Sequence, residues 1–216
     1  MKVVIIGARK DGHAKVVLEI IQSAGLHEVI GFVDDQLFGA NLEIRGIPVI
    51  GRVSDLPELK EQGCEGAITA IGNNFLRRKI GQNIRGAGLQ LINAIHPSVV
   101  IDSDVRLGEG ICLCQGVIIV TGSVIGHCVN IHTGATVDHD NTIEDGANLG
   151  PGVHTAGRVK IGMDAFLGAG TIVIPDGEVG EGAITGAGTV VIRKIEPYTK
   201  VVGVPAKVIE NLKQPI

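Results

Sequence analysis

The chain has 216 residues and a formal net charge of −4, from 19 Lys and Arg against 23 Asp and Glu. This balance offers no basic surface for nucleic acid, and an aromatic content of 2% without Trp removes the stacking platforms that single-strand binders use. Four Cys without a CxxC pair, no signal peptide and no apolar run of membrane length predict a reduced, cytoplasmic protein of one or two domains.

The first 95 residues alternate apolar runs with helical stretches. Such alternation predicts right-handed βαβ crossovers and a parallel sheet, with ligands beyond the carboxyl ends of its strands. Near His96–Pro97 the sequence period changes, which predicts a domain of residues 1–95 and a second of residues 96–216. The expected strands are residues 2–8, 29–35, 66–72 and 89–95, and the expected helices are residues 12–25 and 73–88.

Two stretches of the first domain are candidates for nucleotide binding. In VVIIGARKDGHAKVV, Gly7 and Gly12 permit close backbone approach, and the following helix offers unpaired N–H groups to a phosphate. The stretch is neither GxGxxG nor a P-loop, so an ordinary tight turn explains it equally well. Asp34 and Asp35 close the second strand, where carboxylates can accept hydrogen bonds from a ribose or a base or can form a solvated turn.

From residue 99 to residue 194 the chain divides into sixteen consecutive six-residue words. The third residue is Ile, Leu or Val in fourteen words, with Thr155 and Thr185 as the exceptions. This period predicts a parallel β-helix of three-sided coils, 18 residues each, in which the third residues stack in an apolar interior. Gly recurs at the fourth and sixth positions, where we expect it to supply positive φ at the corners.

His139 is the strongest catalytic candidate within the words. It stands at a fifth position, just after the inward Val137, so its ring is expected to project outward at a corner. Asp138 and Asp140 flank it, and a neighbouring carboxylate suits a general base, although a solvated turn histidine fits the same pattern. Gly157 lies 18 residues further along and should therefore stack on His139 one coil away.

A different set of histidines leaves a second interpretation open. His127, His132 and His154 could meet across coils or subunits as zinc ligands, as in a γ-class carbonic anhydrase. A third possibility is a scaffold without catalysis whose first domain merely binds a nucleotide.

The chain as a whole resembles the NeuD/PglD-type sugar acyltransferases. The resemblance is carried by GARKDGHAKVV, FVDD, AIGNNFLRRK, HPSVVI, VNIHTGATVDHDNTIEDGANLGPGVHTAGRVKIG, two GAG words and VVGVPAKVI. It implies a Rossmann-like nucleotide-sugar-binding domain followed by a left-handed β-helix. It also implies a homotrimer that moves acetyl from acetyl-CoA to the amine of a nucleotide-linked 4-amino-6-deoxy sugar, or to a sialic acid hydroxyl, with no metal. The nucleotide, whether UDP, GDP or CMP, stays open.

The resemblance also implies roles for individual residues. His139 would be the general base with Asp140 beside it, and Gly157 would donate its N–H to the thioester oxygen. The pantetheine arm of CoA would meet Ala169 and Ala187, while the nucleotide sugar would meet Gly12, His13, Asp34, Asp35 and Asn73. The chain departs from the family in a first loop lengthened at Arg9, Lys10 and Asp11, in His132 where relatives often have Asn, and in Asn148 where some have His.

Outward-facing aliphatic residues predict how subunits would meet. Exposed apolar strips favour burial against another subunit. We expect a trimer whose grooves hold CoA between His139 of one chain and Gly157 of the next. The aliphatic residues are Ile118, Val120, Ile172 and Ile174, and the cations available for the CoA phosphates are Arg158, Lys160, Arg193, Lys194 and Lys207.

Overall fold

A computed structural model describes residues 1–9 and 12–214 and divides the chain into two units, Met1–Pro97 and Ser98–Ile216. Lys10 and Asp11, which lengthen the first loop, lie outside the described residues. None of the helices within these two ranges has the length and apolar character needed to cross a membrane.

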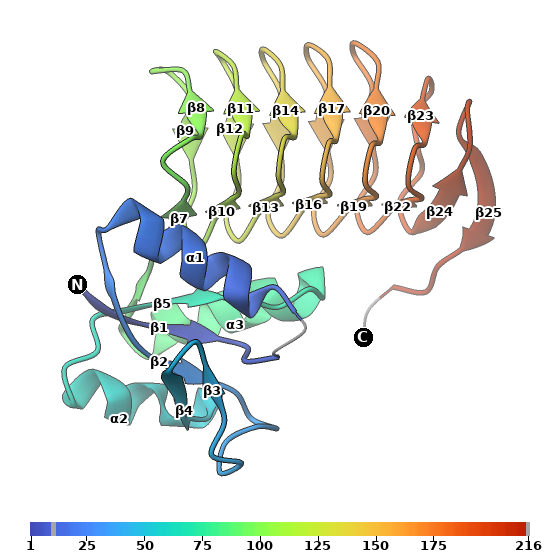
Figure 1. The fold of residues 1–216 in the computed structure, drawn as a ribbon. Coiled ribbons are helices and arrows are strands. Elements are labelled where there is room, and N and C mark those ends of the chain that lie inside the picture. The colour runs from blue at the N-terminus through green and yellow to red at the C-terminus, as the bar shows by residue number, and fades with distance from the viewer. Residues whose placement is uncertain (10–11, 215–216) are drawn as a thin grey trace. The chain divides into compact units, whose positions relative to one another are not determined.

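The first unit contains the predicted strands and helices around a parallel sheet (Figure 1). The sheet has the order β3-β4-β2-β1-β5-β6, with β2, β1 and β5 adjacent and parallel. Helix α1 buries Val17, Leu18 and Ile21 and ends at Gly25, whose left-handed φ of 67° allows its N–H to reach Ile21 O. The predicted elements are β1 (Lys2–Ile6), α1 (Ala14–Ala24), β2 (Glu28–Val33), β5 (Gly66–Thr69) and α3 (Asn74–Gly86).

Several short elements of this unit are not evident from the sequence. An antiparallel hairpin turns at Arg45 and Gly46, both with positive φ, and an arginine in that conformation gives no turn signal. Residues 89–95 form two short strands where one was expected. The additional elements are β3 (Glu43–Ile44), β4 (Ile47–Gly51), η1 (Val53–Asp55), α2 (Leu56–Glu61), β6 (Gln90–Leu91) and β7 (Ala94–Ile95).

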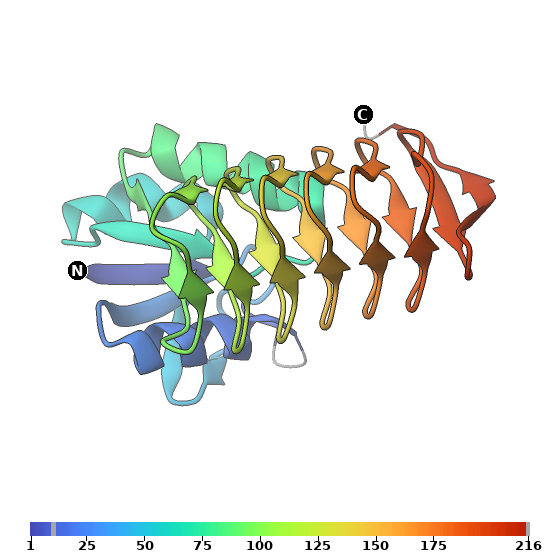
Figure 2. The ribbon, with the colours of Figure 1, turned by 90° about the horizontal axis from the view of Figure 1, so that it is seen from above.

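The second unit is a left-handed parallel β-helix, as predicted (Figure 2). Every word contributes one two-residue strand at its second and third positions, and each strand pairs in parallel with the strand 18 residues away. The strands are β8 (Val100–Ile101), β9 (Arg106–Leu107), β10 (Cys112–Leu113), β11 (Ile118–Ile119), β12 (Val124–Ile125), β13 (Asn130–Ile131), β14 (Thr136–Val137), β15 (Thr142–Ile143), β16 (Asn148–Leu149), β17 (His154–Thr155), β18 (Lys160–Ile161), β19 (Phe166–Leu167), β20 (Ile172–Val173), β21 (Glu178–Val179), β22 (Ile184–Thr185) and β23 (Val190–Val191).

These strands form the three faces of the helix. Face 1 contains β8, β11, β14, β17, β20 and β23, face 2 contains β9, β12, β15, β18 and β21, and face 3 contains β10, β13, β16, β19 and β22. The chain passes from face 1 to face 2 to face 3 in each coil. After the last word a hairpin of β24 (Thr199–Val202) and β25 (Lys207–Asn211) extends face 3.

The two threonines that break the third-position rule are buried and hydrogen-bonded. Thr155 Oγ1 lies 3.4 Å from Thr136 O. Thr185 Oγ1 accepts from Gly168 N at 3.0 Å and lies 2.7 Å from Thr171 Oγ1. These partners offset the cost of placing a hydroxyl in the apolar interior.

Glycine occurs at the corners for two different physical reasons. The sequence prediction that both positions need positive φ is therefore wrong for one of them. Glycines at the sixth position have positive φ, for example 68° at Gly134 and 69° at Gly170. Those at the fourth position do not; there the backbone of the next coil leaves no room for a side chain. A Cβ on Gly168 would lie 2.7 Å from Thr185 O, and one on Gly150 would lie 2.8 Å from Leu167 O.

Candidate active site

His139 and Gly157 lie at the corner between faces 1 and 2, on consecutive coils. We call residues 138–140 and 156–158 the base corner. His139 Nδ1 lies 2.8 Å from Asp140 Oδ2, and 41% of the His139 side chain is exposed. Asp138 Oδ1 accepts from His139 N at 2.8 Å, and Arg158 N donates to His139 O at 2.9 Å. The structure thus fixes the imidazole from its backbone and from one ring nitrogen.

The contact with Asp140 decides which nitrogen of the ring is available. A carboxylate only accepts hydrogen bonds, so Nδ1 carries the proton in the neutral ring and Nε2 keeps its lone pair. Asp140 reaches this position with φ at 58°, a conformation that Asp tolerates better than most residues. The ring therefore presents a proton acceptor at Nε2, next to Gly157.

Gly157 leaves the space that the His139 ring occupies. A Cβ on Gly157 would collide with His139 Nε2 and would lie 2.5 Å from Cε1. The φ of Gly157 is not positive, so the absence of a side chain serves the ring above it rather than the backbone. His139 and Gly157 therefore meet within one chain, as their 18-residue spacing predicts, and the groove between two chains stays a prediction.

An ion pair connects Arg158 of the base corner to Asp176 in the following coil. Arg158 binds Asp176 through two hydrogen bonds, Nε to Oδ1 at 2.7 Å and Nη2 to Oδ2 at 3.0 Å. The Arg158 hydrogen bond holds the pKa of Asp176 below its usual range, and Asp176 in turn raises the pKa of Arg158. One of the cations expected at the CoA phosphates is therefore already paired with a carboxylate of its own chain.

Ala169 and Ala187 lie at the opposite edge of face 1, where face 3 meets it. We call residues 168–170 and 186–188 the amide corner. Both alanines occupy the fifth position of a Gly-Ala-Gly word, as Gly157 does in its own word. Within residues 1–9 and 12–214, the N–H groups of Gly157, Ala169 and Ala187 donate to no acceptor. Each corner thus presents unpaired backbone donors.

Face 1, between the two corners, carries an apolar surface. Ile118, Ile172 and Ile174 are exposed as predicted, whereas Val120 is half-buried. Val100 and Ile192 are further exposed aliphatic residues of this face. A cavity of about 350 Å³ lies in this face beside Asp138, and in it Thr136 Oγ1 lies 2.8 Å from His154 Nδ1.

In the first unit, the predicted residues lie at the carboxyl ends of β1, β2 and β5. His13 is the N-cap of α1. Asp34 is occupied by the backbone: it accepts from Ala8 N at 2.9 Å and from the N–H groups of Gln36 and Leu37 at 3.0 and 3.1 Å. Its carboxylate therefore ties the first loop to the end of β2.

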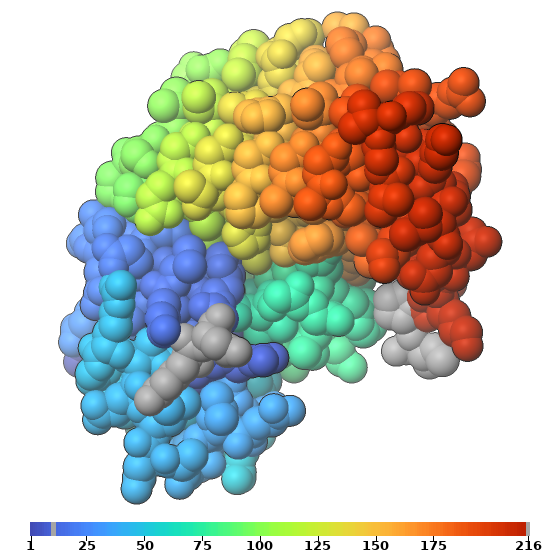
Figure 3. Space-filling view, turned by 45° about the vertical axis from the view of Figure 1, so that its right-hand side comes forward, coloured from blue at the N-terminus to red at the C-terminus, as the bar shows by residue number. Residues whose placement is uncertain are grey.

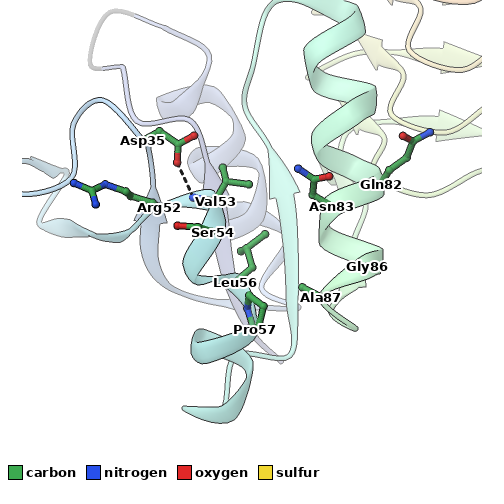
Figure 4. Close-up of a pocket in the computed structure, with 10 residues that line it drawn as sticks. All are labelled: Asp35, Arg52, Val53, Ser54, Leu56, Pro57, Gln82, Asn83, Gly86 and Ala87. Atoms are coloured by element: carbon green, nitrogen blue, oxygen red, sulfur yellow. Dashed lines mark hydrogen bonds between the residues drawn. The ribbon is translucent and has the colours of Figure 1, made fainter.

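Asp35 borders a cavity of about 720 Å³ in this unit (Figure 4). The cavity lies between the η1–α2 segment on one side and α3 on the other, and Asp35 Oδ1 accepts from Val53 N at 2.8 Å. Arg52, Ser54, Gln82 and Asn83 supply further polar groups to its lining. Asn73 caps α3 by accepting from Leu76 N at 2.8 Å.

The histidines of the zinc interpretation are not brought together within the chain. His127 lies at the corner between faces 2 and 3, His132 follows a strand of face 3, and His154 is on face 1. Among the described residues, no three His, Cys, Asp or Glu side chains converge as metal ligands. His132 instead stands beside the buried Cys114, whose pKa is lowered to about 5, mainly by a hydrogen bond with Cys112 and then by His132.

Known proteins resemble both units. Residues 2–84 match the PglD N-terminal domain family. The crystal structure of PerB from Caulobacter crescentus, in complex with CoA and GDP-perosamine, has 43% identity and a TM-score of 0.90, and the match covers 97% of this chain and 98% of that chain. The acetyltransferase domain of PglB from Neisseria gonorrhoeae FA1090, in complex with acetyl coenzyme A, has 33% identity and a TM-score of 0.89, covering 96% and 98%.

Among curated sequences, the GDP-perosamine N-acetyltransferase of Escherichia coli O157:H7 is 29% identical over 157 residues, which are 72% of this chain and 68% of that protein. The hexapeptide β-helix and its CoA-bound relatives define the class as an acetyl-CoA-dependent acyltransferase. The chain belongs to the NeuD/PglD-type sugar acyltransferase family, and it is an acetyl-CoA-dependent N-acetyltransferase of nucleotide-linked amino sugars.

Proposed function

We propose that the acceptor is a GDP-linked 4-amino-4,6-dideoxy sugar of the perosamine type and that His139 is the general base. The relative from Caulobacter crescentus was crystallised with GDP-perosamine, and the curated relative from Escherichia coli is named for the same substrate. The observation that carries the catalytic proposal is the arrangement of His139, Asp140 and Gly157 at one corner.

His139 is positioned to handle the proton of the reaction. The neutral sugar amine attacks the thioester carbonyl carbon and loses a proton as the C–N bond forms. Nε2 accepts this proton, and the imidazolium is stabilised by Asp140, 2.8 Å from Nδ1. When the C–S bond breaks, the imidazolium can return the proton to the CoA thiolate, so CoA leaves as its thiol.

Gly157 would supply a backbone N–H that donates a hydrogen bond to the carbonyl oxygen of the thioester. The tetrahedral intermediate places negative charge on the former carbonyl oxygen, and a fixed backbone N–H directed at that oxygen contributes about 3 kcal/mol in comparable acyl-transfer sites. The Gly157 N–H has no acceptor among the described residues, and it lies beside the ring that would accept the proton.

The first unit would bind the nucleotide part of the sugar. Gly12 and His13 precede the N-terminus of α1, which favours a diphosphate. Asp34 and Asn73 would shape the site indirectly, because their oxygens already hold the adjoining loops. Asp35 offers a carboxylate to a base. Guanine has adjacent N–H donors that a carboxylate accepts together, whereas uracil has one, and this favours GDP over UDP.

The two corners also support a homotrimer. The N–H group of Gly157 and those of Ala169 and Ala187 lie on opposite edges of face 1. Acetyl-CoA bound along one edge of a single β-helix would therefore reach only the donors of that edge. Packing the base corner of one subunit against the amide corner of another would bring both sets to one CoA. The exposed aliphatic residues of face 1 would then be buried.

A cytoplasmic location follows from the proposed substrates, because acetyl-CoA and nucleotide sugars are made there. None of the four cysteines, all of them within the described residues, forms a disulfide, which fits a reducing compartment.

The test is release of CoA thiol from acetyl-CoA by the purified protein with GDP-perosamine, UDP-linked 4-amino-6-deoxy sugars or sialic acid. We expect turnover with GDP-perosamine and its loss in His139→Ala. Equal turnover with the UDP-linked sugars would reject the nucleotide assignment, and turnover with sialic acid alone would move the acceptor to a hydroxyl. A monomer by light scattering would contradict the trimer.

A further inference from the structure

The first position of the words has a buried polar side chain in only four of the sixteen cases. Twelve first positions are aliphatic, Ala or Gly, because this side chain enters the coil interior at the corner. The exceptions are Ser123, Asn141, Thr171 and Thr189, and each is 0% exposed. A buried polar group is costly unless it is hydrogen-bonded, so the partners of these four side chains indicate their function.

Asn141 connects the two halves of the base corner. The two hydrogens of its Nδ2 are shared among three carbonyl oxygens, Asp138 O at 2.7 Å and His139 O at 3.1 Å in its own coil and Ala156 O at 2.8 Å in the next coil. Its Oδ1 is buried without a partner. Asn141 therefore uses the N–H groups of its side-chain amide, while the amide oxygen stays without a hydrogen bond.

The contact with Ala156 O bears directly on Gly157. The Ala156 carbonyl and the Gly157 N–H belong to one trans peptide group, in which the two point in opposite directions. By holding the carbonyl inside the coil, Asn141 turns the Gly157 N–H outward. A hydrogen bond accepted by the carbonyl also polarises the N–H of the same peptide group.

The other three side chains contact equivalent peptide groups. Ser123 Oγ donates to Asp138 O at 2.9 Å, and that carbonyl shares its peptide group with the His139 N–H. Thr171 Oγ1 donates to Gly168 O at 2.8 Å, in the peptide group of the Ala169 N–H. Thr189 Oγ1 donates to Gly186 O at 2.8 Å, in the peptide group of the Ala187 N–H.

We infer that Ser123, Asn141, Thr171 and Thr189 are positioning residues that hold the corner peptide groups of His139, Gly157, Ala169 and Ala187 from inside the coil. This inference rests on the proposed function, which gives those four residues their roles. All four polar first positions coincide with corner peptides assigned to the acyl-transfer site. An aliphatic residue at the first position fills the same space but cannot donate to these carbonyls.

The inference predicts that substitutions of the first-position residues affect kcat at the base corner and the KM for acetyl-CoA at the amide corner. Asn141→Val introduces the side chain that is most common at first positions, and we expect kcat to fall at least about tenfold with the KM values within about twofold of wild type. Thr171→Val keeps the shape and removes the hydroxyl. Because it loosens the Ala169 N–H, we expect it to raise the KM for acetyl-CoA severalfold with little change in kcat.

Two further variants separate positioning from stability. Val129→Ala truncates a buried first-position side chain whose own corner carries no proposed site residue, so it should lower the melting temperature and leave kcat and both KM values unchanged. Asn141→Ser restores one hydroxyl donor and should recover part of kcat. If Asn141→Val does not fold, Asn141→Ser against Val129→Ala provides the same comparison.

The measurements are kcat, both KM values and the melting temperature of each variant, with GDP-perosamine and acetyl-CoA. A kcat within twofold of wild type in Asn141→Val would overturn the inference, as would an equal loss of kcat in Val129→Ala at matched melting temperature. An unchanged KM for acetyl-CoA in Thr171→Val would overturn it for the amide corner. Failure of the proposed function would differ, since wild-type protein would then show no turnover.

Discussion

The base corner and the amide corner share one backbone design and differ in their side chains. Gly157, Ala169 and Ala187 all occupy the fifth position of a word and present an unpaired N–H. At the base corner this N–H lies beside an imidazole, a carboxylate and an ion pair, whereas the amide corner has only Gly-Ala-Gly. Under the proposed function, the same turn would support proton transfer where side chains surround it and simple binding where they are absent.

This difference predicts that base-corner variants lower kcat and that amide-corner variants raise the KM for acetyl-CoA. The largest effect is expected from His139→Ala, which removes the proton acceptor and should lower kcat at least about a hundredfold. The protein should stay folded because the ring is partly exposed at a corner. Steady-state kinetics and circular dichroism measure the two properties.

His127→Ala is a matched control, because His127 is also a fifth-position histidine but lies at the corner between faces 2 and 3. It should keep wild-type turnover. A similar loss of kcat in both variants would reject the special role of His139.

Gly157→Ala should have the next largest effect. The new Cβ would collide with the His139 ring and displace it, and a misplacement of about 1 Å can cost roughly a hundredfold in rate. In a His139→Ala background the ring is gone, so Gly157→Ala should have almost no further effect on kcat. Additive losses in this double-mutant cycle would show that the glycine acts independently of the ring.

Ala169→Pro tests the amide corner by removing one backbone N–H. The substitution converts Gly-Ala-Gly to Gly-Pro-Gly, the sequence that Gly150–Gly152 already has at the equivalent place in its word. The fold should therefore tolerate it, whereas loss of one hydrogen bond should raise the KM for acetyl-CoA by about tenfold. An unchanged KM in kinetics at varied acetyl-CoA would place the pantetheine arm elsewhere.

Asp176→Asn should have the smallest effect, since surface ion pairs contribute little to stability. Arg158 lowers the pKa of Asp176 in the folded state, so the pair stabilises the fold at neutral pH and the contribution disappears as the pH falls through that lowered pKa. The difference in melting temperature between wild type and variant should be present at pH 7 and vanish in acid. A difference that persists in acid would contradict an electrostatic origin.

Prediction from sequence succeeded where a feature depends on a local period. The third-position aliphatic residues fix the inward face of each strand, and the 18-residue coil places Gly157 on His139. Prediction from sequence failed where a feature depends on backbone atoms that are far away in the sequence or on a turn residue that is not typical of turns. The arginine at the Arg45–Gly46 turn gave no signal, and the fourth-position glycines are explained by the neighbouring coil rather than by φ.

The candidate site shows the same division. The pattern around His139 and Asp140 was enough to nominate the pair, but the availability of Nε2 depends on the contact between Nδ1 and the carboxylate. Asp34 and Asp35 are indistinguishable in the sequence. In the structure one binds three backbone N–H groups and the other borders a cavity.

The sequence by itself determined the number of strands in the β-helix, their register and the corner on which each fifth-position residue lies, because a strict six-residue period leaves one way to stack the coils. Only the tertiary structure decided which backbone donors stay unpaired and which buried side chains hold them. At the base corner those properties depend on hydrogen bonds between residues 15 to 18 positions apart, as in the contact from Asn141 to Ala156. No local pattern specifies such bonds, since they form only when one coil is laid on the next.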